Sequence, residues 1–178
     1  MQMNSQKPVV SHTQRLFLAL WPDGPARHQL SLHARAWTWP PDCVQYLPVD
    51  WHVTLHFIGE VPTVRVADIA ANVALPCQAF ECVLDRPRLW PHGLAVLCAN
   101  KVPAALQNLH DRLGDALCGL GLPVETRPYC PHVTLARRAD TAVLPVISPS
   151  VVWQISRYAL VVSTGKRDGH YRTIREYQ

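Results

Sequence analysis

Apolar residues recur along this chain in short blocks that prolines and glycines separate. Short apolar or alternating runs predict strands, because successive side chains of a strand point to opposite faces. Apolar residues three and four positions apart predict helices instead. We expect helices at 25–37, 62–75 and 102–120. We expect strands at 15–22, 49–58, 79–89, 94–99, 132–137, 153–163 and 171–177.

The helix predicted at 102–120 carries the clearest stripe, with leucines at 106, 109, 113 and 117 on one face and glycines at 119 and 121 to end it. The resulting order β-α-β-α-β-β-α-β-β-β is typical of an α+β fold with short strands. No linker or low-complexity stretch divides the chain. We therefore expect a flexible tail at 1–13 and a single domain at 14–178.

Composition agrees with a folded globular domain. The chain has 178 residues, of which 48% are apolar and 17% charged, so it can bury a core without a disulfide or metal. No apolar run approaches the roughly 20 residues that cross a bilayer, and no signal peptide is apparent. The six cysteines lack C-x-x-C spacing, which indicates reduced thiols. We expect a cytoplasmic monomer that has no membrane contact.

One tetrapeptide occurs twice. His52-Val-Thr-Leu55 and His132-Val-Thr-Leu135 are identical and lie 80 residues apart, each in a predicted strand. Residues two apart share a face of a strand, so each histidine lies beside its threonine. The valines and leucines then face the opposite layer. If pseudo-two-fold symmetry relates the strands, both pairs converge on one cleft.

A cleft with two imidazoles and two hydroxyls suits phosphodiester chemistry. Two histidines near their usual pKa can share one proton, so that one is a base and the other an acid. Threonine hydroxyls can donate to the non-bridging oxygens of a charged transition state. No carboxylate cluster accompanies them, so we expect neither a metal nor another cofactor. A lone His-x-Thr would indicate a structural histidine, but two identical copies favour catalysis.

The chain resembles the 2H phosphoesterase superfamily, and more narrowly the bacterial RNA 2′,3′-cyclic phosphodiesterases, also called 2′-5′ RNA ligase-like proteins. The resemblance covers residues 15 to about 177 and rests on three stretches: RLFLALWPD at 15–23, WHVTLHFIGEV at 51–61 and PHVTLAR at 131–137. It implies a bilobal α+β fold, with two pseudo-symmetric lobes of antiparallel strands and outer helices around a central cleft. It also implies metal-independent hydrolysis of an RNA terminal 2′,3′-cyclic phosphate to a 2′-phosphate.

The resemblance also implies roles for individual residues. His52 would be the proton donor to the leaving 3′ oxygen, and His132 the proton acceptor that activates water. Thr54 and Thr134 would bind the phosphate. Phe57 and Arg137 lie five residues after the two histidines and match positions that contact the terminal nucleoside. The substrates would be RNA ends or nucleoside 2′,3′-cyclic phosphates.

Several alternatives stay open. The same motif serves 2′-5′ oligonucleotide, cyclic nucleotide and ADP-ribose cyclic phosphate hydrolysis, and 2′-5′ RNA ligation. A non-catalytic module that binds RNA ends would not need two proton-transfer groups, and a zinc protein would need ligand spacing that is absent. Strict alternation places His56 on the face of His52, as a bystander at the rim. Tyr129 and His170 are expected at the rim and on the surface.

Overall fold

The computed structural model describes residues 12–147, 149–165 and 170–178. The tail expected at 1–13 lies outside these residues apart from its last two positions, and Thr13 begins the first strand. The strands are β1 (Thr13–Leu20), β2 (Val44–Gln45), β3 (Val53–Pro62), β4 (Phe80–Trp90), β5 (Leu94–Ala99), β6 (His132–Arg137), β7 (Val151–Ile155), β8 (Tyr158–Ser163) and β9 (Tyr171–Tyr177). The helices are α1 (Gly24–Arg35), α2 (Val66–Asn72) and α3 (Ala104–Gly119), with 3-10 turns at Thr63–Arg65 and Pro91–Gly93.

The helices form where the sequence provides caps and apolar stripes. The Asp23 carboxylate accepts a hydrogen bond from the backbone N–H of Ala26 at 2.8 Å, which satisfies a free donor in the first turn of α1. In α3 the predicted stripe is buried, with Leu106, Leu113 and Leu117 all at 0% exposure. No helix within the described part of the chain is long and apolar enough to cross a membrane.

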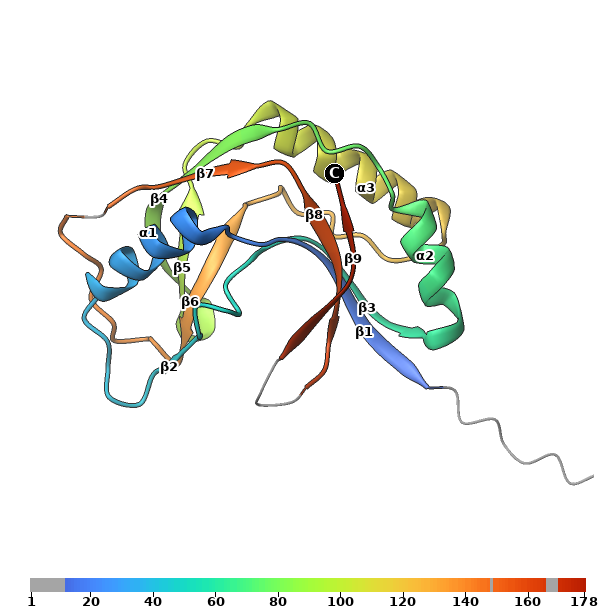
Figure 1. The fold of residues 1–178 in the computed structure, drawn as a ribbon. Helices are drawn as coiled ribbons and strands as arrows, with labels where there is room; N and C mark the ends of the chain where they lie inside the picture. Colours follow the sequence, from blue (N-terminus) through green and yellow to red (C-terminus); the bar gives the residue numbers. More distant parts are fainter. Residues whose placement is uncertain (1–11, 148, 166–169) are drawn as a thin grey trace, which may run out of the picture.

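The strands form one curved sheet in the order β7-β4-β5-β6-β3-β1-β8-β9, and β2 pairs with β6. Its strand pairs are antiparallel. The strands of the two motifs, β3 and β6, meet in the middle, where Val53 pairs with Val133. α3 contacts β3, α1 contacts β7, and α2 and α3 lie on the outer side of the curve (Figure 1). The α+β prediction is confirmed, and the expected lobes are the two halves of this sheet.

The prediction of one strand at 153–163 is wrong, because the chain changes sheet halves at residues 156–157. β7 pairs with β4 at one edge of the sheet, whereas β8 pairs with β1 in the other half. The burial pattern changes at the same point. Side chains alternate between buried and exposed along β7, but the first five residues of β8 are all buried. The helix predicted at 62–75 is shorter, since Thr63–Arg65 form a 3-10 turn before α2.

The main core fixes which face of the central strands is free. Val53, Leu55, Val133 and Leu135 are at most 3% exposed and belong to the same cluster as the α3 leucines. Because neighbouring side chains of a strand point to opposite faces, the histidine and threonine of each motif project away from that core. The sheet therefore presents both motifs on the face opposite α3.

Candidate active site

A cavity of about 280 Å³ lies on this free face of the sheet. His52, Thr54, His132 and Thr134 line it together, as the twin motifs predict. Phe57 and Arg137 line it as well, so one cavity contains all six residues selected from the sequence. The remaining lining residues are Arg15, Phe17, Tyr46, Asp50, Ser163 and Tyr171.

The spacing of these residues is explained by a β-bulge in each motif strand. On β3, Thr54 pairs with Ala19 and His56 with the preceding residue, Leu18, so Leu55 is an extra residue in the register. On β6 the register shift skips Leu135 in the same way. A bulge reverses the alternation of faces beyond it. The residue five positions after each histidine therefore faces the cavity, and the two motifs share the same burial pattern.

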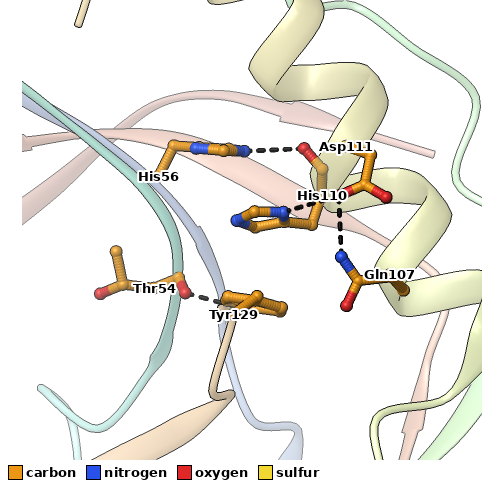
Figure 2. Close-up of polar contacts among 6 residues, drawn as sticks. All are labelled: Thr54, His56, Gln107, His110, Asp111 and Tyr129. Carbon is orange, nitrogen blue, oxygen red and sulfur yellow. Dashed lines mark hydrogen bonds and ion pairs between the residues drawn. The ribbon is translucent and has the colours of Figure 1, made fainter. Parts of the chain in front are cut away.

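The bulge also corrects the expectation for His56. Strict alternation placed this side chain at the cleft rim, but it is 3% exposed and does not line the cavity. Its Nε2–H donates to the backbone carbonyl of His110 on α3 at 2.7 Å, and the two rings stack with centroids 4.1 Å apart (Figure 2). Burial lowers the pKa of His56. His56 thus fastens β3 to α3 behind the site.

Tyr129 extends the same stack and joins it to the first motif. Its ring stacks on His110 at 4.0 Å, and its hydroxyl donates to the backbone carbonyl of Thr54 at 3.1 Å (Figure 2). Burial raises the pKa of this phenol, so the hydroxyl keeps its proton. Tyr129 precedes His132 by three residues and does not line the cavity. It therefore ties the segment leading into the second motif to the strand of the first.

The two motif histidines have equivalent second contacts. His52 Nδ1 lies 2.7 Å from the backbone carbonyl of Asp50, and His132 Nδ1 lies 2.7 Å from that of Cys130. A carbonyl only accepts, so Nδ1 carries the proton in both rings. In the neutral imidazoles Nε2 is then unprotonated. Each motif thus holds its histidine in the same tautomer and leaves Nε2 as the nitrogen that exchanges a proton.

Burial lowers the pKa of both histidines. Around His52 the ring centroids of Phe17, Trp21 and Tyr171 lie 5.1, 5.1 and 5.0 Å away, and His132 lies 4.4 Å from Trp90. The hydrogen bond to the carbonyl acts in the opposite direction in each case. A lowered pKa keeps at least one ring neutral near pH 7, which a proton acceptor requires.

The two nucleoside-binding candidates lie at the rim. Phe57 is 59% exposed, and the Arg15 guanidinium lies 6.0 Å from its ring centroid. The Arg137 guanidinium lies 5.3 Å from the ring of Tyr46. An exposed ring and a guanidinium on opposite halves of the sheet can each stack on a base.

Six residues that line the cavity are not predicted from the sequence, because they belong to no repeated motif. Arg15 and Phe17 are two apart on one strand, and alternation alone would place them on one face without saying which. Tyr46 and Asp50 come from the connection between α1 and β3, and Ser163 and Tyr171 from β8 and β9. Of these six residues, Asp50 is the one whose place near the site is indicated locally, since it lies two residues before His52.

A curved antiparallel sheet with two His-x-Thr pairs in one cavity defines the class of two-histidine phosphoesterases. A family model described as the 2′-5′ RNA ligase superfamily matches residues 27–167. The chain belongs to this superfamily.

Individual relatives agree with that assignment. The chain is 30% identical over 165 residues to an Escherichia coli (strain K12) protein named RNA 2′,3′-cyclic phosphodiesterase, and the match covers 89% of this chain and 92% of the relative. A solved structure described as a phosphoesterase aligns with a TM-score of 0.80 at 25% identity, over 93% of this chain and 98% of the other. E. coli LigT in complex with 3′-AMP aligns with a TM-score of 0.79 at 25% identity, over the same shares.

Proposed function

We propose that this protein hydrolyses the 2′,3′-cyclic phosphate at RNA ends to a 2′-phosphate, without a metal or other cofactor. The observation that carries the proposal is the pair of equivalent Nδ1–carbonyl bonds at His52 and His132 in one cavity. Two imidazoles in the same tautomer provide the acid and the base that a phosphodiester cleavage needs. The activity named for the E. coli relative supports the same reaction.

The reaction requires one proton to enter and one to leave the phosphate centre. His132 Nε2 accepts a proton from water as the water oxygen forms a bond to phosphorus. The bond between phosphorus and the 3′ oxygen breaks, and His52 Nε2–H donates a proton to that oxygen. The products are a 2′-phosphate and a 3′-hydroxyl. In-line attack needs the two histidines on opposite sides of the phosphorus, and their location on different halves of the sheet supports this arrangement.

The remaining lining residues have complementary roles in this proposal. Thr54 and Thr134 donate hydrogen bonds to the two non-bridging phosphate oxygens, and these bonds strengthen as charge develops. Phe57 and Arg137 contact the terminal nucleoside. Stacking of this kind tolerates any base, so we expect weak base preference.

The proposal includes the setting in which the enzyme works. It acts as a monomer in the cytoplasm, with residues 14–178 as a single domain. Its substrates are RNA ends and nucleoside 2′,3′-cyclic phosphates.

The decisive experiment incubates the purified protein with an oligonucleotide that ends in a 2′,3′-cyclic phosphate, in the presence of a chelator. We expect the 2′-phosphate product, and a loss of kcat of at least about a hundredfold in His52→Ala and in His132→Ala. His28→Ala removes an exposed imidazole on α1 and is the matched control. Activity that the chelator abolishes, or that either motif variant retains in full, would refute the mechanism.

A further inference from the structure

Among the described residues that line the cavity, a carboxylate adjoins one motif histidine and not the other. Each ring donates to the carbonyl of the residue two positions upstream, which is Asp50 for His52 and Cys130 for His132. Asp50 is 6% exposed, and among the described residues it is the one carboxylate that lines the cavity. At the equivalent position on the other half, Cys130 is an exposed cysteine. The symmetry of the motifs therefore ends at a single negative charge.

Asp50 is held by contacts at three of its polar groups. Its backbone N–H donates to the carbonyl of Leu47 at 2.9 Å, and its own carbonyl accepts from His52. Its carboxylate oxygen Oδ2 accepts from His170 Nδ1 at 2.9 Å. His170 is separated from Asp50 by 120 residues and its side chain is 40% exposed. The carboxylate is thus anchored to the edge of the sheet through a histidine that solvent reaches.

A carboxylate is an unexpected component of a cavity that receives a phosphate. Burial of a carboxylate costs free energy unless it is paired, and its charge repels an anionic substrate. The turn at 47–50 needs the backbone of residue 50 and makes no use of this charge. The carboxylate is paired with His170 and also lines the cavity, so its charge acts on the groups of the site.

We propose that Asp50, held by His170, is a positioning residue that makes His52 the protonated member of the histidine pair. This inference rests on the proposed hydrolysis. An adjacent negative charge stabilises the imidazolium form of His52, and no equivalent charge adjoins His132 within the described part of the cavity. His170 satisfies the carboxylate and, when protonated, neutralises it toward the incoming phosphate. The Asp50–His170 pair thus makes His52 the proton donor, although the two motifs have the same sequence.

The other charged groups that face the cavity do not reproduce this effect. Arg15 from β1 and Arg137 from β6 are cations, and a cation does not stabilise an imidazolium. Tyr46 and Tyr171 stay neutral, because burial raises the pKa of each phenol. Burial is the main influence on the pKa of His52 and lowers it. The hydrogen bond to the Asp50 carbonyl raises this pKa, His132 lowers it, and the Asp50 carboxylate raises it.

The test is Asp50→Asn, which keeps the backbone carbonyl and the side-chain shape but removes the charge. NMR titration of the histidine rings in the free protein follows His52 and His132 separately. We expect the His52 midpoint to fall by at least about half a pH unit and the His132 midpoint to move less. With a nucleoside 2′,3′-cyclic phosphate, the alkaline limb of kcat/KM should move to lower pH by the same amount, because that limb reports loss of the donor's proton. Asp115→Asn removes an exposed carboxylate from α3 and controls for net charge.

His170→Gln provides a second test that leaves residue 50 intact. The amide can still donate to Asp50 but cannot become a cation, so the carboxylate stays uncompensated. We expect KM for the cyclic phosphate to rise severalfold while kcat changes little.

Two results would overturn the inference: an unchanged His52 midpoint in Asp50→Asn, or a shift confined to His132 and the acidic limb. The NMR titration does not depend on turnover, so it separates this inference from the proposed function. A wild-type protein that titrates as expected but does not cleave the substrate would refute the function alone.

Discussion

Acidification below pH 6.5 should destabilise this protein through His56. This side chain is 3% exposed, and its burial favours the neutral ring in the folded state, whereas the hydrogen bond from Nε2–H to the carbonyl of His110 acts in the opposite direction. Burial lowers the pKa of His56 below its usual value of 6.5; the His110 ring lowers it further, whereas Asp111 raises it. Between pH 6.5 and this lower folded value, the unfolded chain binds more protons than the folded chain. Stability is therefore fully present above pH 6.5 and falls as the pH drops through that window.

The size of the effect follows from proton linkage. One proton bound only by the unfolded state changes the free energy of unfolding by up to about 1.4 kcal/mol per pH unit. His56→Gln keeps an amide N–H that can reach the carbonyl of His110 but cannot titrate. Urea unfolding at pH 7.5, 6.5 and 5.5, followed by circular dichroism, should show a flatter pH dependence in this variant than in the wild type.

His28→Gln removes an exposed histidine from α1 and serves as the comparison. If His56→Gln lost stability between pH 6.5 and 5.5 as steeply as the wild type, the role of His56 in the linkage would be refuted.

Three further predictions concern the framework behind the site. Tyr129→Phe deletes the hydroxyl that donates to the carbonyl of Thr54, and should lower the free energy of unfolding in urea by about 1 kcal/mol. Leu135→Ala truncates a side chain that is 1% exposed at the bulge of β6, and should cost about 2–5 kcal/mol in the same assay. Gly93→Ala should lower the melting temperature, because Gly93 has φ +68° and a Cβ there would lie 3.0 Å from the backbone nitrogen of Ala139. At Gly119 a Cβ would meet no atom within 4 Å, so Gly119→Ala should not destabilise the protein.

Much of the fold can be predicted, because the spacing of apolar residues along the chain reflects which side chains are buried. The strands at 94–99, 132–137 and 171–177 begin and end where the pattern predicts. The prediction of a continuous strand at 153–163 is wrong because both of its parts are apolar, and apolar character does not reveal which partner a strand pairs with. β7 and β8 lie in different halves of the sheet, and only the pairing with β4 and β1 separates them.

The residues of the candidate site are likewise predicted in part from the sequence and explained in part by strand pairing. Repetition of a tetrapeptide is enough to select His52, Thr54, His132 and Thr134 from the sequence. The position of Phe57 on the cavity face follows from a family pattern, and its physical cause is a bulge that only strand pairing reveals. The same bulge turns His56 to the other face, contrary to strict alternation.

The sequence by itself determined the class of fold, the superfamily and the residues of the two motifs. These properties are local, since a tetrapeptide or an apolar stripe is complete within a few residues. Tertiary structure alone decided which distant residue holds the carboxylate beside the first motif. The contact between Asp50 and His170 joins residues 120 positions apart, and it exists because β9 completes one half of the sheet beside the cavity. No local pattern encodes such a contact, because it depends on how distant strands pack.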